Sequence, residues 1–98
     1  MVQSFANAAI SNFFYYEKVP RKAGWASVKN IARRKLTMLN AAQSVSDLKS
    51  PPGNKLESLK ADLKGYYSIR INDQWRVIFK WNRKDNGPTE VNIVDYHK

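Results

Sequence analysis

The sequence predicts an α+β fold in which two main N-terminal helices pack on one face of a small antiparallel sheet. Three patterns carry this prediction. Residues 65–81 alternate apolar and polar side chains on either side of a polar turn, as a β-hairpin does. Residues 25–42 repeat apolar side chains at three- and four-residue steps, and residues 6–16 show the same spacing over a shorter stretch. With 98 residues, we expect one domain, 1–98, with one core.

The N-terminal segment is expected to hold the first helix. Residues 2–5 alternate weakly and could form a short strand. Within 6–16, helical spacing relates the apolar side chains of Ala9, Ile10, Phe13 and Phe14. Proline and glycine continue helices poorly, so the mostly polar segment 18–24 is predicted to be a loop, and its residues 18–22 are basic.

The stretch 25–42 is the clearest helix. Its apolar stripe consists of Trp25, Val28, Ile31, Ala32, Leu36 and Leu39. Such a stripe needs a surface to cover it, and the apolar face of the hairpin is the natural candidate. We therefore expect all three tryptophans to pack in the core rather than stack on bases.

The connection to the hairpin is expected to be irregular. Two prolines and a glycine in 50–54 exclude both a helix and a central strand there. The following residues, 55–65, are anchored by Leu56, Leu59 and Leu63.

Side chains of a strand point to opposite faces in turn, so the hairpin has two different faces. Its odd-numbered residues are apolar, whereas the opposite face presents Arg70, Arg76 and Lys80. After a polar turn at 82–88, residues 90–97 are predicted to form a third strand. That strand ends in Asp95, Tyr96 and His97, an ionisable triplet beside the basic face.

Charge and composition narrow the classes of function. The chain has 17 Lys and Arg against 8 Asp and Glu, a net charge of +9, which favours a polyanionic partner such as RNA, DNA or the ribosome, or an acidic protein. Without cysteine, disulfides, thiolate catalysis and thiolate metal sites are excluded, and the single histidine excludes a multi-histidine metal site within one chain. We expect no metal, no cofactor and no membrane partner. Since there is no long apolar run or signal-type segment, we expect a cytoplasmic protein.

Several segments together resemble a known family. RINDQWRVIF (70–79), the run LESLKADLKGYYSI (56–69), SPPGNKLE (50–57) and the terminal IVDYH (93–97) are similar to the host-inhibition toxins of bacterial toxin–antitoxin modules, the HigB branch of the RelE-like superfamily. The similarity spans essentially the whole chain. It implies helices packed on one face of an antiparallel sheet, with the other face concave.

The resemblance also implies an activity: metal-free, ribosome-dependent cleavage of messenger RNA by attack of the substrate's own 2′-hydroxyl. The implied partners are a HigA-like antitoxin with a helix-turn-helix domain, the 70S ribosome with its mRNA, and operator DNA through the antitoxin complex. The family's catalytic positions match Lys60, Arg76, Asp95, Tyr96 and His97.

These residue types suit the implied chemistry. Arg76 offers a permanently charged fork for phosphate oxygens, and Lys60 a second point charge. The ordinary pKa of an imidazole is near neutral pH, so His97 could give or take a proton there. Tyr96 could stack on a base or donate a proton, and Asp95 could orient His97 or act as an acid–base group itself.

Glu57 departs from some relatives, which have a histidine at this position. It is an accessory candidate, either as a weaker proton-transfer group or as a salt-bridge partner of nearby lysines. The remaining candidates bind RNA through charge alone: Arg70, Lys80, Lys64, Arg21 and Lys22. The alternative function is a basic protein that binds RNA, DNA or the ribosome without cleaving, and acts as an inhibitor or transcriptional co-repressor.

Overall fold

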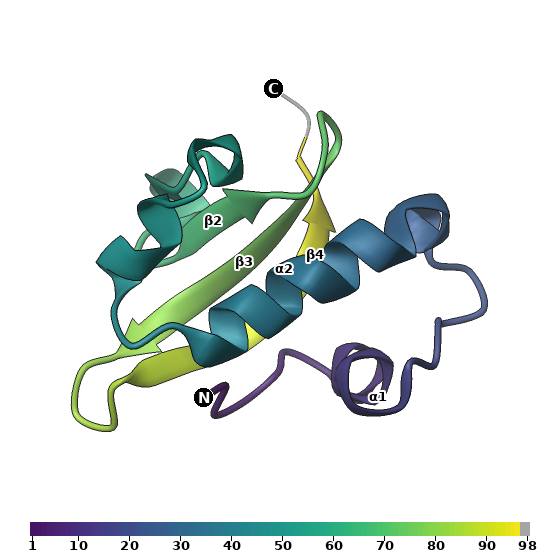
Figure 1. Cartoon of the computed structure of the whole chain (residues 1–98), viewed down its shortest axis with the longest axis horizontal. Coiled ribbons are helices and arrows are strands. Elements are labelled where there is room, and N and C mark those ends of the chain that lie inside the picture. Colours follow the sequence, from purple (N-terminus) through teal and green to yellow (C-terminus); the bar gives the residue numbers. More distant parts are fainter. Residues whose placement is uncertain (97–98) are drawn as a thin grey trace.

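The protein forms two layers, with helices on one face of a four-stranded antiparallel sheet. The computed structural model describes residues 1–96, so His97 lies outside the described residues. The sheet has the order β1-β2-β3-β4, and Figure 1 shows β3 between β2 and β4. The elements are α1 (Ala8–Tyr16), η1 (Gly24–Val28), α2 (Lys29–Ala41), η2 (Val45–Lys49), η3 (Pro52–Asn54), β1 (Glu57–Ser58), η4 (Ala61–Leu63), β2 (Tyr67–Arg70), β3 (Trp75–Asn82) and β4 (Gly87–Asp95).

Both predicted helices are present. The side chain of Asn7 caps α1 by accepting a hydrogen bond of 3.1 Å from the Ile10 amide. Helix α1 packs against α2 and β4. The centre of its Phe13 ring lies 4.5 Å from the centre of the Trp25 ring.

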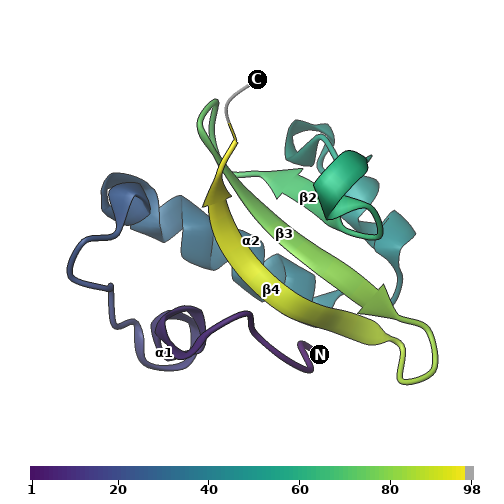
Figure 2. The same cartoon turned by 180° about the vertical axis from the view of Figure 1, so that it is seen from behind.

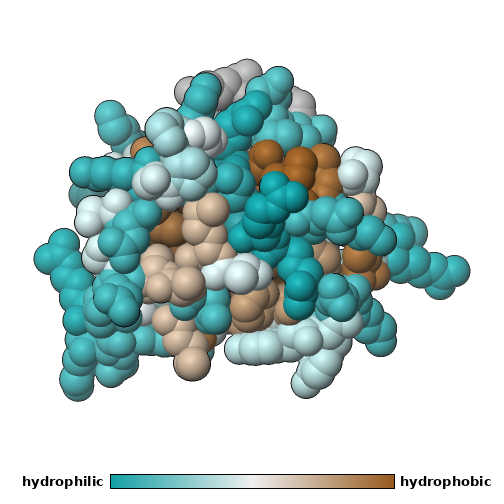
Figure 3. All heavy atoms as spheres, in the orientation of Figure 1, coloured by the Kyte–Doolittle hydropathy of each residue, from teal (hydrophilic) through white to brown (hydrophobic). Residues whose placement is uncertain are grey.

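The helix predicted over 25–42 is wrong in its first turn, which winds as the 3₁₀ helix η1, so the α-helix starts only at Lys29. Val28, the last residue of η1, leaves helical geometry with φ −117° and ψ 23°. Gly24 opens this turn against the ring of Trp75, where an added Cβ would lie 2.7 Å from a ring carbon. The outward side of α2 is hydrophilic (Figure 3) and exposes Lys29, Arg34 and Thr37.

The third strand begins earlier than predicted. Strand β3 continues to Asn82 and β4 starts at Gly87, so the turn comprises only residues 83–86. Proline is compatible with β4 because β4 is the last strand in the order of the sheet. On the side of β4 away from β3, the Pro88 carbonyl accepts a hydrogen bond of 2.9 Å from the Gln3 amide. The strand predicted over 2–5 is reduced to a single parallel bridge between Phe5 and Val91.

The segment between α2 and β2 is more regular than predicted. It contains the 3₁₀ turn η3, although helix was excluded there, because a proline fits the first position of a helical turn. Residues 55–65, expected to be irregular, contain β1, which pairs Glu57 with Ser68 and Ser58 with Tyr67. This two-residue strand is too short to show an alternation in the sequence.

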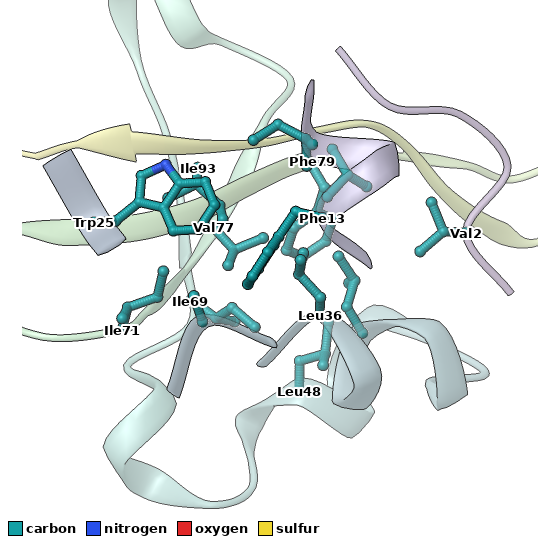
Figure 4. Packing of buried hydrophobic residues seen from close by; sticks show 14 of the residues in the cluster. Val2, Phe13, Trp25, Leu36, Leu48, Ile69, Ile71, Val77, Phe79 and Ile93 are labelled. Carbon is teal, nitrogen blue, oxygen red and sulfur yellow. The ribbon is translucent and has the colours of Figure 1, made fainter. Parts of the chain in front are cut away.

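The core lies between α2 and the odd-numbered face of the sheet, as predicted (Figure 4). Ile69, Val77 and Phe79 are fully buried there. Trp25 is part of this core, while Trp75 and Trp81 are half-buried against it, which confirms their packing role.

Within residues 1–96, no helix has the length and apolar character needed to cross a membrane.

The even-numbered face of β3 and β4 is turned away from the helices (Figure 2). The alternation predicts basic side chains on this face but does not give their burial. Ser68 of β2 and Arg76 and Ile78 of β3 are buried on it. Arg76 is covered by the loop before β1 and by the residue after β4, which both contact it.

Candidate active site

Arg76 lies at the centre of a cluster on the even-numbered face. Only 7% of it is exposed. Its Nη1 donates hydrogen bonds to Ser68 Oγ at 2.7 Å and to the Lys55 carbonyl at 3.2 Å. Its Nη2 forms a salt bridge of 2.9 Å with Glu57 Oε1, and its guanidinium carbon lies 4.8 Å from the centre of the Tyr96 ring. The guanidinium is therefore fixed in one orientation.

Strand pairing brings these groups together. Glu57 and Ser68 are directly opposite on β1 and β2, and Ser68 in turn is opposite Ile78, two residues along β3 from Arg76. Their side chains therefore share one face of the sheet. Lys55 adopts a left-handed conformation with φ 45° at the end of η3, and its carbonyl meets the guanidinium from the loop side.

Two hollows meet at this cluster. A groove of about 480 Å³ is lined by Lys55, Glu57, Arg70, Asn72, Asp73, Arg76 and Tyr96. A second hollow of about 300 Å³ is lined by Glu57, Ser58, Leu59, Lys60, Leu63 and Tyr96. Glu57 and Tyr96 line both, so four of the predicted site residues, Glu57, Lys60, Arg76 and Tyr96, share one continuous surface.

Asp95 is not brought to this group by the strand pairing. It is opposite Trp75, whereas Arg76 is opposite Val94. Because neighbouring residues of a strand face opposite ways, Asp95 lies on the helix side of the sheet, at its end. There its Oδ2 accepts a hydrogen bond of 3.1 Å from Gln74. The predicted role of His97 falls outside the described residues.

The charged candidates for RNA binding lie in different places. Arg70 lines the groove and pairs with Asp73. Lys80 lies 5.0 Å from the centre of the Tyr66 ring and 3.4 Å from the Glu90 carboxylate, further along β3.

Lys64 is exposed just after η4. Arg21 and Lys22 are also exposed, but they belong to the loop that follows α1 in the helical layer (Figure 1). Arg21 lines a separate hollow there, together with α1 residues Ala9 and Asn12. These two basic residues are therefore not part of the groove.

Ser68, Lys55 and Asp73 contribute to the site although sequence reasoning missed them. Ser68 reads as an ordinary polar position in an alternating strand, and Lys55 contributes a backbone carbonyl, which no sequence pattern reveals. The spacing of Asp73, three residues after Arg70 across the hairpin turn, could have indicated the ion pair between them. The hydrogen bond and charge of Arg70 hold the pKa of Asp73 below its ordinary value.

Basic groups crowd the neighbourhood of Arg70. Burial, Arg34 and Arg70 together lower the pKa of Lys35, whose Nζ donates a hydrogen bond of 2.6 Å to Asn54 Oδ1.

Among residues 1–96, no three His, Cys, Asp or Glu side chains are grouped so that they could hold a metal ion.

Solved structures show the class of fold. YoeB from the YoeB–YefM complex of Staphylococcus aureus has a TM-score of 0.58 at 20% identity, with 100% of this chain and 99% of that chain covered. YafQ from E. coli has a TM-score of 0.58 at 17% identity, over 97% and 91% of the two chains. The chain thus has the fold of these two solved structures.

Sequence comparison then gives the family. Residues 3–97 match the family model of the RelE-like toxin HigB of type II toxin–antitoxin systems. Toxin HigB-1 of Vibrio cholerae serotype O1 is 43% identical over 81 residues, which cover 83% of this chain and 84% of that toxin. A protein of Haemophilus influenzae is 32% identical over 83 residues, or 85% and 81% of the two chains. The chain belongs to the HigB-like family of RelE-like toxins of type II toxin–antitoxin systems.

Proposed function

We propose that this toxin is a ribosome-dependent endoribonuclease that cleaves translated mRNA and thereby inhibits translation and growth. The observation that carries the proposal is the fixed guanidinium of Arg76, which lines the groove on the sheet face turned away from the helices, next to the second hollow. An arginine fork that is held in advance suits the charge that develops on a phosphate during cleavage.

The guanidinium retains donors for a substrate. Arg76 Nη1 donates hydrogen bonds to Ser68 and to the Lys55 carbonyl, and Nη2 lies 2.9 Å from Glu57 Oε1 in an ion pair. We propose that Nε and Nη2 donate to the phosphate oxygens of the substrate. Tyr96, whose ring lies against the same guanidinium, is proposed to stack on a base next to the cut.

In the proposed reaction, the 2′-hydroxyl of one nucleotide attacks the adjacent phosphorus. The bond from phosphorus to the 5′ oxygen of the next nucleotide breaks, which leaves a 2′,3′-cyclic phosphate and a 5′-hydroxyl. One proton leaves the attacking hydroxyl and one reaches the departing oxygen. We assign these transfers to His97, with Glu57 as an accessory group and Asp95 in the role of orienting His97, while Arg76 and Lys60 stabilise the charged phosphate.

The proposed partners follow from the family and from charge. YoeB is in complex with YefM in one of the fold relatives. An antitoxin is likewise the partner of this toxin, and we propose a HigA-like helix-turn-helix protein that also carries the pair to operator DNA. The net charge of +9 favours binding to the 70S ribosome in the cytoplasm, and we propose that Arg21 and Lys22 contact ribosomal RNA, with Lys64 and Lys80 along the messenger.

The test compares the wild type with Arg76→Ala in growing cells. Induction of the wild type should arrest growth and create new 5′ ends in messenger RNA, and Arg76→Ala should do neither. Arg83→Ala is the matched control, since Arg83 is exposed in the turn at the far end of β3. Arrest without new ends, or arrest that Arg76→Ala leaves unchanged, would favour the alternative of a non-cleaving inhibitor.

A further inference from the structure

Arg70 and Arg76 form an opposed pair of arginines in the groove. They are directly opposite in the pairing of β2 with β3, and both line the groove. Cβ atoms of opposite residues in an antiparallel pair are about 4.5–5.5 Å apart, and like charges at such positions destabilise the sheet. Each guanidinium here has its own carboxylate, because Nη2 of Arg70 pairs with Asp73 and Nη2 of Arg76 pairs with Glu57.

The two ion pairs differ strongly in burial. In the Arg76–Glu57 pair, the side chains are 9% and 37% exposed, whereas in the Arg70–Asp73 pair they are 31% and 99% exposed. An ion pair whose carboxylate is fully hydrated contributes little to stability. Asp73 can therefore leave Arg70 at small cost, while Arg76 stays fixed by Ser68 and Lys55.

The surroundings of the pair carry an excess of positive charge. Lys55 lines the same groove, and Lys35 lies close enough to Arg70 for the two charges to interact. Three cations that line the groove, Arg70, Arg76 and Lys55, thus face two carboxylates, Asp73 and Glu57, and Lys35 adds positive charge nearby. A groove of this kind attracts anions, and two guanidinium forks side by side match successive phosphate groups of one strand.

We propose that Arg70 binds a second phosphate of the RNA, next to the one at Arg76, and that Asp73 occupies the place of this phosphate until RNA displaces it. The proposal rests on the proposed function, and it assigns to the groove a two-phosphate site with an internal competitor. Arg70 then positions the strand, while Arg76 contacts the phosphate that reacts.

The test measures binding of a short single-stranded oligoribonucleotide whose 2′-hydroxyls are all methylated, so that no attack can occur. Fluorescence anisotropy gives its Kd for each variant over a series of salt concentrations. Arg70→Ala should weaken binding about ten-fold and reduce the slope of log K against log salt by about 0.7, the value for one phosphate contact on a single strand. Arg70→Lys should restore the slope but only part of the affinity, since lysine keeps the charge without the fork.

Asp73→Asn is the decisive variant, because it removes the competitor with almost no change in shape. It should tighten binding about two- to five-fold. Arg83→Ala is the control and should change neither affinity nor slope. Thermal unfolding of each variant shows that it is folded.

The two-phosphate site is refuted if Arg70→Ala keeps the wild-type slope of log K against log salt, if Asp73→Asn binds no tighter than the wild type, or if the wild type itself does not bind at low salt. The outcome is separate from the proposed cleavage, because the probe cannot be cleaved. Binding that depends on Arg70 in a protein that cuts no mRNA would refute the proposed function but not the two-phosphate site.

Discussion

Ser68→Ala tests whether the buried serine holds Arg76 in place. Ser68 is fully buried, and its Oγ accepts the shortest hydrogen bond that Arg76 makes, at 2.7 Å. The substitution removes this acceptor and opens almost no cavity. A hydrogen bond to a charged group contributes roughly 1.5–3 kcal/mol. Because Arg76 keeps Glu57 and the Lys55 carbonyl, we expect the lower end, about 1.5 kcal/mol, or a Tm about 6–12 °C lower.

Cleavage should fall as well, because a guanidinium with one fewer support is less well aligned with the phosphate. We expect about a ten-fold loss, since small misplacements of a catalytic group cost up to about a hundred-fold. Urea or thermal unfolding measures the stability, and single-turnover cleavage on programmed ribosomes measures the activity. Ser27→Ala, a change at an exposed serine in η1, is the control.

Two results would refute this reasoning. One is a Ser68→Ala protein that matches Ser27→Ala in both stability and cleavage. The other concerns the double variant Ser68→Ala/Arg76→Ala. Since Arg76 is absent there, Ser68→Ala should cause almost no further loss of stability. Losses that simply add would show that Ser68 acts independently of Arg76.

Three further predictions follow from the same contacts. Glu57→Ala should slow cleavage less than Arg76→Ala, because Glu57 supports Arg76 and is only an accessory group in proton transfer, whereas Arg76 binds the phosphate itself; equal large losses would place Glu57 in the active set. Asn54→Ala should lower the free energy of unfolding by about 2–3 kcal/mol in urea titrations, because Asn54 is fully buried and its amide donates to the Leu48 carbonyl at 3.1 Å; a change below about 0.5 kcal/mol would contradict this. Because Arg70 lowers the pKa of Asp73 from its ordinary 3.8, this carboxylate stabilises the fold above that pH and loses its effect as the pH falls through the folded-state pKa. Asp73→Asn should therefore lose slightly less stability than the wild type on acidification below about pH 4, and a greater loss for Asp73→Asn would contradict the pairing.

Local patterns were enough to predict most of the fold. The alternation in 65–81 predicts the buried odd-numbered face correctly, because a period of two depends only on the strand itself. The apolar stripe of 25–42 likewise predicts a helix against that face. The first turn of that helix was wrong because the apolar spacing does not distinguish an α-helix from the 3₁₀ turn η1, which ends where Val28 leaves helical geometry.

The burial of Arg76 could not be predicted, because it results from contacts that depend on pairing. The residues that cover it come from β1, from the loop before β1 and from the end of β4. Strand β1 has two residues, too few for a pattern. The family resemblance supplied Lys60 and Tyr96, which do share a surface with Arg76. Asp95 was expected on the same face, but its pairing with Trp75 gives the opposite one.

The most direct test of the proposed chemistry uses ribosomes programmed with a defined mRNA and the purified toxin. Two messages are compared, one all-ribose and one with a single 2′-deoxy nucleotide on the 5′ side of the mapped cut. The account predicts that the ribose message is cut at this site only when ribosomes are present, that its upstream fragment ends in a 2′,3′-cyclic phosphate, and that the deoxy message stays intact there. Equal cleavage of the deoxy message would contradict attack by the 2′-hydroxyl, and cleavage of free mRNA at the same rate would contradict ribosome dependence.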